Sequence, residues 1–331
     1  MSSGSVRVAT DKLQLEKLAI DRLRAAWNGF SARELPGPVV TLRAPRDEGK
    51  SVVFGLGTVE AGGLRIVAKE LLAAAATVEV RIYKDVLPDL PLRGPQLLGA
   101  VDSVDSGRVW LFLEEIVGPR FDKTDGGHVG MASRWLATLH ATSKQSEVGE
   151  SLSWRGPDYY ESLMTRTLSE LEELPANPAI DREHVEVLRR LSCHLERLRS
   201  GRDAFADVYL GLPASVVHGD FKGNNMAFSE TIAPSALRVF DWSEAHRGPW
   251  AVDLSWVDPS EYLAGLVSHG QRCDRADVDE WVVFGSIVRW TLAASWEIPG
   301  LRYEWVERRM RHMAMYENRL GTAIESSGWL R

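Results

Sequence analysis

The stretch VVHGDFKGNNMAFSE, residues 216–230, sets a group of charged and amide side chains between two apolar segments that look buried. Within eight positions it holds His218, Asp220, Lys222, Asn224 and Asn225. Glycine, aspartate and asparagine favour turns, so a turn would explain any one of these residues alone. The whole set needs an explanation that includes the residues downstream.

The order and spacing of three oxygen-bearing side chains indicate a chemical site. Asn225 lies five residues after Asp220, and Asp241 follows at the end of a further apolar strand. An aspartate can accept the proton of a hydroxyl group, and an asparagine and a second aspartate can supply hard oxygen ligands to Mg²⁺. We therefore expect Asp220 and Asn225 at one end of a hairpin and Asp241 on its neighbour, with turn chemistry as the alternative.

The N-terminal third of the chain predicts a small sheet. Residues 11–28 carry apolar side chains at mostly helical spacing, which predicts an amphipathic helix before the sheet. Residues 71–86 predict a second helix. Short β-rich runs predict five strands, at 38–45, 51–59, 63–72, 95–103 and 108–116. We expect the first three to be antiparallel, because the glycines of EAGG favour a hairpin.

After residue 120 the pattern changes to helices that mostly lack proline and glycine inside. The expected helices are 127–144, 158–173, 181–199, 275–297 and 302–321. Between them, residues 214–243 read as short apolar strands that carry the motif. A β-rich part followed by a helical part predicts an α+β chain with two lobes and a cleft between them.

Bulk properties exclude several classes of protein. The net charge of −7 over 331 residues argues against a general nucleic-acid binder, which usually carries a basic excess. No stretch reaches 18 apolar residues, so we expect no membrane span. Cys193 and Cys273 show neither metal nor disulfide spacing, and the N-terminus lacks an uninterrupted apolar segment, so a cytoplasmic location is expected.

Four segments together resemble the aminoglycoside phosphotransferase and choline kinase superfamily, which shares the protein-kinase-like fold. HGDFKGNN (218–225) is similar to its HGD-x4-N catalytic loop, and VFDW (239–242) to its metal-binding strand end. GPWAVDLSW (248–256) is similar to the segment in which an aspartate followed by leucine buttresses that loop. SRWLATLHA (133–141) is similar to the helix that packs behind the active site.

The resemblance covers most of the chain, about residues 38–300, and implies a bilobal α+β fold. Residues 1–115 would form the N-terminal lobe, with the N-terminal helix and a small antiparallel nucleotide-binding sheet that contains one helix. Residues 116–331 would form a larger, mainly helical C-terminal lobe with the catalytic loop and the acceptor site. The motifs are specific to the superfamily but not to a substrate.

The resemblance also implies a nucleotide site in the N-terminal lobe. Lys69 ends an apolar strand, where its ammonium would reach the α- and β-phosphates, and Glu79 in the next helix would be its acidic partner. The alternatives are a solvated lysine at a strand end and a surface carboxylate.

Two main-chain segments would complete that nucleotide site. The linker residues Glu114, Glu115 and Ile116 would offer backbone N–H and C=O groups to the adenine edge. The turn that covers the phosphates would be 46–51, ending at Ser51, although it lacks the glycine pattern of protein kinases.

Within the catalytic loop, the resemblance implies Asp220 as the base and Asn225 and Asp241 as magnesium ligands. Lys222 would either reach the γ-phosphate and offset charge in the transition state or point to solvent. Asn224 has the right chemistry for a metal, but the spacing favours Asn225. We expect His218 to fix the loop through hydrogen bonds.

The implied activity is the transfer of the γ-phosphoryl group of ATP, or GTP, to a hydroxyl group of a small molecule, with Mg²⁺. Residues 241–281 hold nine acids against three arginines, a balance that would suit a polyamine such as an aminoglycoside. Tryptophans in the same segment would stack on a sugar or pack in the core. We therefore expect an antibiotic acceptor, aminoglycoside-like or otherwise sugar-containing, and a role in resistance or self-protection.

Two other functions stay open. One is a metabolic kinase that acts on choline, an amino alcohol or a free sugar. The other is a catalytically silent kinase-like binding module, although silent members usually lose one of the four residues that this chain keeps, namely Lys69, Asp220, Asn225 and Asp241. The sequence does not set the oligomeric state.

Overall fold

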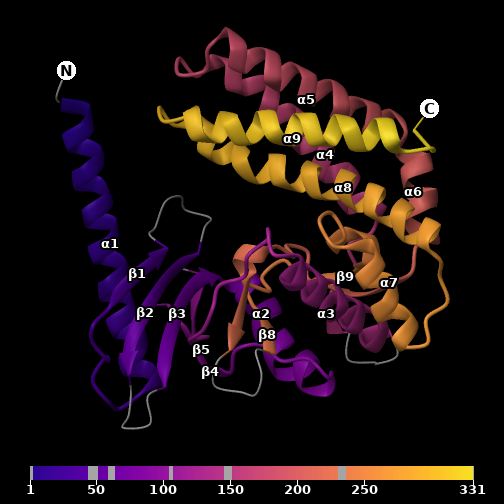
Figure 1. The fold of residues 1–331 in the computed structure, drawn as a ribbon. Coiled ribbons are helices and arrows are strands. Elements are labelled where there is room, and N and C mark those ends of the chain that lie inside the picture. Colours follow the sequence, from indigo (N-terminus) through magenta and orange to yellow (C-terminus); the bar gives the residue numbers. More distant parts are fainter. Residues whose placement is uncertain are drawn as a thin grey trace. The chain divides into compact units, whose positions relative to one another are not determined.

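The computed structural model describes residues 3–43, 51–58, 64–103, 107–144, 151–229 and 236–330. Its contacts divide the chain into two compact units (Figure 1). The first, here called the sheet unit, comprises Met1–Phe121 and Gly223–Ala245. The second, here called the helical unit, comprises Asp122–Lys222 and His246–Arg331.

The sheet unit is built on a five-stranded antiparallel sheet with the order β1-β2-β3-β5-β4. Its strands are β1 (Val40–Arg43), β2 (Val52–Thr58), β3 (Arg65–Leu72), β4 (Leu97–Asp102) and β5 (Arg108–Glu114). Side chains alternate between the two faces of a strand, so successive residues of β3 serve different neighbours. Ile66 and Ala68 are buried in the core on the face of the sheet that α1 covers.

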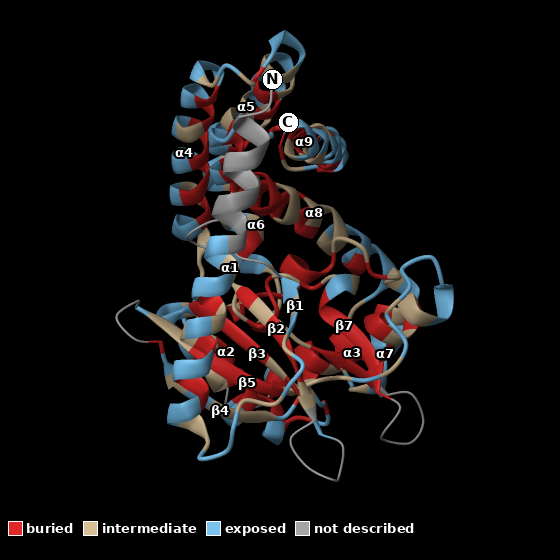
Figure 2. Cartoon of the chain, turned by 90° about the vertical axis from the view of Figure 1, so that its left-hand side faces the viewer, coloured by how far each residue is buried: buried red, intermediate tan, exposed pale blue. Residues whose placement is uncertain are grey.

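Helix α1 (Ser3–Phe30) packs against this sheet. Leu23 and Trp27 are buried, and the Trp27 ring meets Phe112 of β5 edge to face at 5.2 Å. Figure 2 shows the buried strands of the sheet beside the helix. Arg22 adds two charge-assisted hydrogen bonds to Glu70 of β3, at 2.8 and 2.7 Å. Helix α1 therefore packs on one face of the sheet.

Helix α2 (Ala73–Arg81) follows β3 directly and continues as a π-helical turn, Ile82–Val86. The helix expected at 71–86 is thus present, with its last turn widened. A short hairpin completes the sheet unit, formed by β7 (Met226–Ser229) and β8 (Ala236–Val239).

The helical unit contains most of the helices. They are α3 (Gly126–Lys144), α4 (Pro157–Glu173), α5 (Arg182–Ser200), α6 (Arg202–Gly211), α7 (Pro259–Ser268), α8 (Arg275–Glu297) and α9 (Glu307–Ser326). Leucine, isoleucine and methionine side chains of α4, α5, α8 and α9 share one core. A two-stranded sheet pairs β6 (Ala214–Val217) with β9 (His246–Pro249), and β6 leads into the segment that holds His218 and Asp220.

The expected α+β class is confirmed: an antiparallel sheet with helices precedes a mainly helical remainder. Two short helices, α6 and α7, were not predicted, because ten residues give little periodic signal. Helix α9 begins at Glu307 rather than 302, because Ile298–Arg302 forms a 3₁₀ turn. The EAGG turn lies outside the described residues.

One expectation about the catalytic loop is wrong. The strand before Asp220 does not form a hairpin with the strand after Asn225, because β6 pairs with β9 and β7 pairs with β8. Contacts accordingly group residues 223–245 with the sheet unit, while Asp220 belongs to the helical unit. The lobe boundary expected between residues 115 and 116 stays a prediction.

None of the described helices is long and apolar enough to cross a membrane.

Candidate active site

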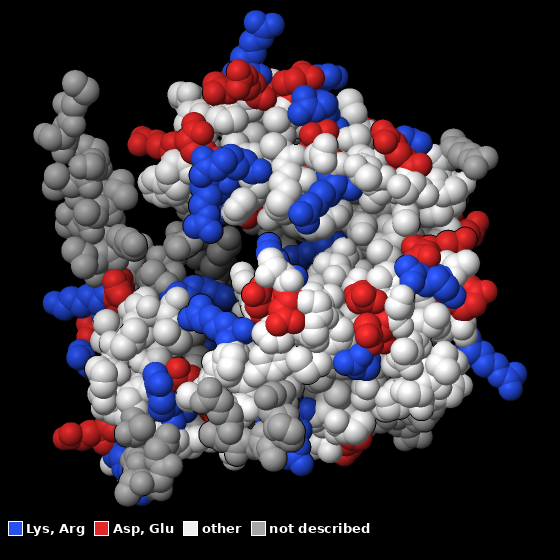
Figure 3. Space-filling view, in the orientation of Figure 1, with Lys and Arg blue, Asp and Glu red and all other residues white. Residues whose placement is uncertain are grey.

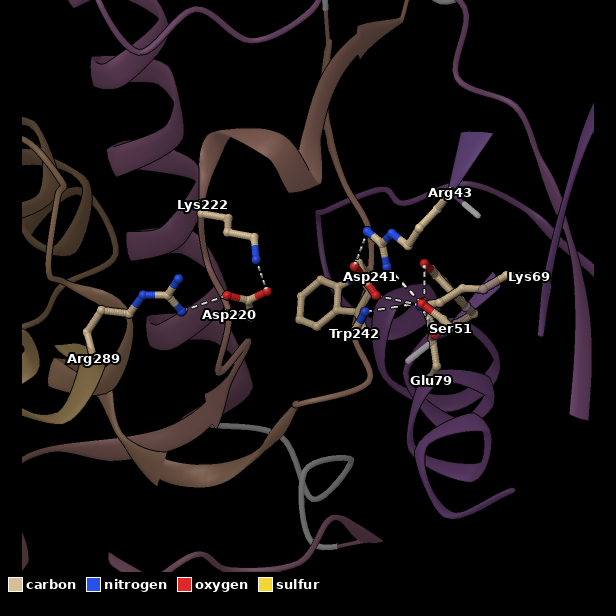
Figure 4. Close-up of polar contacts among 10 residues, drawn as sticks. Arg43, Ser51, Lys69, Glu79, Asp220, Lys222, Asp241, Trp242 and Arg289 are labelled. Atoms are coloured by element: carbon tan, nitrogen blue, oxygen red, sulfur yellow. Dashed lines mark hydrogen bonds and ion pairs between the residues drawn. The ribbon is translucent and has the colours of Figure 1, made fainter. Parts of the chain in front are cut away.

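Lys69 is the centre of a charged cluster in the sheet unit. Its Nζ atom lies 2.6 Å from Oε2 of Glu79 in α2 and 2.5 Å from Oδ1 of Asp241, which follows β8 (Figure 4). The lysine side chain is only 5% exposed. Burial disfavours the charged ammonium, but the charges and hydrogen bonds of Asp241 and Glu79 outweigh it, so the pKa of Lys69 lies above its usual value.

Glu79 is held by more than the lysine. Its Oε1 atom accepts hydrogen bonds from the Tyr83 hydroxyl at 3.4 Å and from the backbone N–H of Trp242 at 3.3 Å. Burial and the nearby carboxylates of Glu79 and Asp241 raise the pKa of Tyr83 well above its usual value, so its hydroxyl stays protonated and can donate. The Glu79 carboxylate therefore connects α2 to the backbone next to Asp241.

Asp241 has an unusual backbone conformation. Its φ of 68° lies in the left-handed region, which residues other than glycine rarely adopt. Next to it, the fully buried Trp242 donates its indole N–H to the carbonyl of Val239 at 3.2 Å. A conformation of this kind persists only where the surroundings fix it, and here it accompanies the contact between the carboxylate and Lys69.

Asn225 lies beside Asp241 through the β7–β8 hairpin. The backbone N–H of Phe240 donates to the carbonyl of Asn225 at 3.0 Å, so both residues lie at the same end of the hairpin. Asn225 is 1% exposed, whereas Asn224 is exposed to solvent. The structure thus separates the two asparagines in the way that the spacing favours.

This end of the hairpin suits Mg²⁺. An amide and a carboxylate offer hard oxygen ligands, and Mg²⁺ commonly takes one or two protein ligands and completes its shell with phosphate oxygens and water. No group of three His, Cys, Asp or Glu residues that could hold a metal occurs in the described part of the chain. The residues present therefore fit a magnesium ion that is shared with phosphates, and do not form a closed metal cage.

Arg43, at the end of β1, is a residue that the sequence reasoning missed. Its Nη2 atom lies 3.4 Å from Oδ2 of Asp241, and its Nη1 atom donates to the Ser51 hydroxyl at 2.8 Å. Ser51, predicted at the phosphates, is thus linked through an arginine to the predicted metal ligand. Residues 46–50 of the predicted phosphate turn lie outside the described residues. Only the position of Arg43 at a strand end could have indicated it.

The linker after β5 uses part of its main chain within the protein. The N–H of Glu114 donates to the carbonyl of Gln96, and the N–H of Glu115 donates to the carbonyl of Arg65, both at 2.9 Å. For the predicted contact with an adenine edge, this leaves the amide of Ile116 and the carbonyl oxygens. The prediction therefore narrows to those groups.

In the helical unit, Asp253 fixes the start of the catalytic loop. Its carboxylate accepts the backbone N–H of His218 at 2.6 Å and that of Gly219 at 2.9 Å. Gly219 has a φ of 77°, which a residue with a side chain would rarely adopt. Burial opposes the charge on Asp253, but the nearby His140 imidazole and His218, whose backbone N–H donates to the carboxylate, hold its pKa below the usual value.

His140 of α3 completes this support. Its Nε2 atom lies 3.5 Å from Oδ2 of Asp253, and its Nδ1 atom lies 2.8 Å from the Tyr262 hydroxyl of α7. Burial lowers the pKa of His140, and Asp253 offsets only part of that effect. Two segments that resemble the family thus meet behind the loop, as expected from the sequence.

The loop itself is packed by rings and hydrogen bonds. His218 accepts the N–H of Asp220 at its Nδ1 atom, at 3.3 Å, which agrees with the supporting role expected for it. The Phe221 ring stacks on Trp256 at 5.4 Å and on Trp135 at 5.9 Å. The Trp256 indole donates to the Phe221 carbonyl at 2.5 Å. These contacts hold the backbone on both sides of Asp220.

Asp220 carries a cation on each of its carboxylate oxygens (Figure 4). Lys222 Nζ lies 2.5 Å from Oδ2, and Arg289 Nη1, from α8, lies 2.6 Å from Oδ1. Lys222 therefore points toward Asp220. Arg289 was not predicted, since it lies 69 residues away in a helix with no motif.

Comparison with known protein families decides the assignment. The model of the phosphotransferase enzyme family matches residues 58–258. The chain belongs to the phosphotransferase enzyme family. The expected superfamily is confirmed, and so is the expected enzyme class, a small-molecule phosphotransferase with an alcohol acceptor, at the level of the family. A comparison with curated protein sequences found no match.

Solved structures show the fold of this phosphotransferase. A choline kinase from Cryptosporidium parvum Iowa II is 12% identical, with a TM-score of 0.62, covering 93% of this chain and 95% of that one. An aminoglycoside 2′-phosphotransferase IIIa mutant in complex with GDP is 10% identical, with a TM-score of 0.60, covering 93% and 99%. A macrolide 2′-phosphotransferase from Brachybacterium faecium is 15% identical, with a TM-score of 0.54, covering 88% and 95%.

The acidic residues of this phosphotransferase between 241 and 281 do not form a free acidic wall. Asp253 holds the catalytic loop, and Glu261 pairs with Arg134. Others cap helices or pair with cations, namely Asp258, Asp274, Asp277, Asp279 and Asp241. Figure 3 shows acidic and basic side chains interspersed on the visible face. The charge of this stretch is therefore largely used within the protein.

Proposed function

We propose that this phosphotransferase transfers the γ-phosphoryl group of ATP, or GTP, to a hydroxyl group of a small molecule, with Mg²⁺. The observation that carries the proposal is the buried Lys69, which is paired with both Glu79 and Asp241. A lysine, its acidic partner and a metal-binding aspartate are the parts that position phosphates in kinases.

The sheet unit would bind the nucleotide. Lys69 would donate to the α- and β-phosphates, and Glu79 would hold its ammonium in place. Asn225 and Asp241 would hold Mg²⁺, which when bound neutralises charge on the phosphate oxygens. Arg43, already linked to Asp241 and Ser51, would offer a further positive charge to the phosphates.

The helical unit would supply the base. Asp220 would orient the acceptor hydroxyl and take its proton as the hydroxyl oxygen bonds to the γ-phosphorus. The bond from that phosphorus to the bridging oxygen breaks, and the nucleoside diphosphate leaves. The loop is fixed by Asp253 and by the stacked ring of Phe221, so the carboxylate is positioned before any substrate arrives. Lys222, which contacts the same carboxylate, would offset negative charge that develops in the transition state.

The acceptor is the finer part of the proposal. The sequence favours an antibiotic with a role in resistance, and structures of similar fold include an aminoglycoside phosphotransferase, a macrolide phosphotransferase and a choline kinase. A metabolic kinase of choline, an amino alcohol or a sugar is the alternative. Because most of the acids between 241 and 281 are used within the protein, charge does not support a polycationic acceptor.

A silent binding module is the least supported function. Such a module would not need the ion pairs that Lys69 makes with Glu79 and Asp241, nor the fixed loop of Asp220.

Two free cysteines, Cys193 and Cys273, are consistent with the cytoplasmic location that we infer.

A transfer assay tests the proposal. The protein would be incubated with γ-labelled ATP or GTP, with and without Mg²⁺, and with aminoglycosides, macrolides, choline, amino alcohols, hexoses and hydroxy acids. Transfer of label to at least one hydroxyl compound, only with Mg²⁺, is the expected result. Mg²⁺-dependent nucleotide binding without transfer to any acceptor would favour the silent module.

A further inference from the structure

Arg289 is a positioned cation next to the catalytic aspartate. Its side chain is 15% exposed, and Nη1 lies 2.6 Å from Oδ1 of Asp220. The guanidinium also lies over the Trp296 ring, 5.4 Å from its centroid, which restricts its orientation. Within the described part of the chain, Nη1 is the one nitrogen of Arg289 that has a hydrogen-bond partner. The fork of this arginine therefore keeps donors for a further group.

The surroundings of Asp220 carry an excess of positive charge. Lys222 and Arg289 together place two cations on one carboxylate. Tyr316 of α9 lies near this group: burial and the charge of Glu297 raise its pKa above the usual value, and Arg289 opposes that effect.

Helix α9 adds further basic residues, Arg309, His312 and Arg319. Glu297 is already paired with Arg309 and His312. Arg319 lies over the Trp290 ring at 4.7 Å and has no carboxylate at ion-pair distance among the residues that the structure describes. Among the described ion pairs here, three Lys or Arg side chains pair with two carboxylates: Lys222 and Arg289 with Asp220, and Arg309 with Glu297. The Arg289 side chain is only 15% exposed, and a largely buried cation is best offset by an anion.

The loop does not need Arg289 for its shape. Asp253 holds the amides of His218 and Gly219, and Phe221 is stacked between two tryptophans. Lys222 already neutralises the Asp220 carboxylate. An arginine in addition is therefore better explained by a ligand that carries a negative charge.

We propose that Arg289 determines acceptor specificity by binding an oxyanionic group, a carboxylate or a phosphate, of the hydroxyl compound whose proton Asp220 takes. The proposal rests on the proposed function, because it places the acceptor at Asp220. It commits the acceptor to an anionic or zwitterionic hydroxyl compound, and disfavours polycations. A planar fork binds both oxygens of such a group at once.

Paired acceptors test this inference. D-glycerate is compared with glycerol for the carboxylate, ribose 5-phosphate with ribose for the phosphate, and kanamycin and choline serve as cationic acceptors. We expect the wild-type protein to favour the anionic member of at least one pair. Arg289→Gln should lower kcat/KM for that member by roughly 30-fold or more, chiefly through KM. Neutral acceptors should lose less, and chiefly through kcat, because Arg289 also contacts Asp220.

Two further variants separate specificity from structure. Arg289→Lys keeps the charge and should retain part of the preference. Arg275→Gln removes an exposed arginine at the other end of α8 that pairs with Asp279, and should change nothing. An equal loss of kcat for every acceptor in Arg289→Gln would mean that Arg289 only positions Asp220, and would overturn the proposal. A wild-type preference for neutral or cationic acceptors would also overturn it.

Binding measurements keep the two proposals distinct. The affinity for D-glycerate, glycerol, ribose 5-phosphate and ribose is measured by calorimetry in wild type and in Arg289→Gln. Anion binding that disappears in Arg289→Gln supports the inference even where no transfer occurs, and in that case only the proposed function fails. The inference is contradicted if the wild-type protein binds the anionic and neutral members with equal affinity. It is also contradicted if the wild-type protein binds neither member.

Discussion

Lys69 and Glu70 are neighbours in β3. The carboxylates that pair with Lys69 and the arginine that pairs with Glu70 lie on opposite faces of the sheet. Lys69 pairs with Glu79 of α2 and with Asp241, whereas Glu70 pairs with Arg22 of α1. Alternation along the strand produces this division. The first residue serves the proposed nucleotide site and the second attaches the N-terminal helix.

Replacing Lys69 by methionine should remove nucleotide handling and leave two carboxylates, Glu79 and Asp241, without their shared cation. We expect kcat/KM for the nucleotide to fall by about 10²-fold or more, and the free energy of unfolding to fall by about 3 kcal/mol. Steady-state kinetics and urea denaturation measure the two effects. An unchanged KM and kcat for ATP would contradict the role of Lys69.

Replacing Glu70 by glutamine should affect stability and not chemistry. The change leaves Arg22 without its partner and weakens the contacts with Ser103 and Arg108, so we expect a loss of about 2 kcal/mol in the free energy of unfolding. Turnover well below the melting temperature should be unchanged. Asp21→Asn is the control. Asp21 lies in α1 next to Arg22, and its ion pair with Arg24 is exposed and contributes little to stability. Similar losses in both variants would refute the anchoring role.

The two adjacent asparagines offer a matched test of the metal site. Asn225→Ala should raise the Mg²⁺ concentration for half-maximal rate by roughly tenfold or more, because a ligand is lost. Asn224→Ala should change it less than twofold, since Asn224 is exposed. A magnesium titration of the transfer rate decides this, and equal effects of the two changes would remove Asn225 from the metal site.

The buried His140 makes stability depend on pH. Burial lowers its folded pKa below the value of about 6.5 that applies to the unfolded chain, so the unfolded state binds the proton more readily. Its contribution is present above pH 6.5 and is lost as the pH falls through the folded pKa. Between pH 7 and 5 the free energy of unfolding should therefore fall, by up to about 1.4 kcal/mol per pH unit.

His140→Gln isolates that contribution. Glutamine can still reach the Tyr262 hydroxyl but does not titrate, so the slope between pH 7 and 5 should become shallower. In the wild type Asp253 does not interfere in this range, because its lowered pKa places its loss of charge in stronger acid. Urea denaturation at a series of pH values measures both slopes. Identical slopes in the two proteins would show that His140 is not the source.

Much of the site could be predicted because its signals are local in sequence. Asp220, Asn225 and Asp241 follow short apolar strands at fixed spacing, and Asn225 and Asp241 do lie at one end of the β7–β8 hairpin. Lys69 and Glu79 were indicated by the resemblance to the family, and they pair at 2.6 Å. The roles assigned to all five residues stay predictions that the variants above examine.

The rest depends on tertiary contacts that no spacing reveals. Arg43 and Arg289 reach Asp241 and Asp220 across 198 and 69 residues of sequence, and neither lies in a motif. The pairing of β6 with β9 was missed because a four-residue strand does not indicate its partner. The acids between 241 and 281 suggested an acidic wall because sequence does not show that Asp253 holds the backbone of His218 and Gly219 or that Glu261 pairs with Arg134.

The most direct test of the account is the rate of Mg²⁺-dependent phosphoryl transfer to the best acceptor in wild type and in Asp220→Asn, measured together with nucleotide affinity. Asparagine keeps the size of the side chain but cannot take the hydroxyl proton. The account predicts that the rate falls by roughly 10²- to 10⁴-fold, while the Kd for ATP or GTP changes less than about threefold. A variant that transfers phosphate at near the wild-type rate would contradict the central claim.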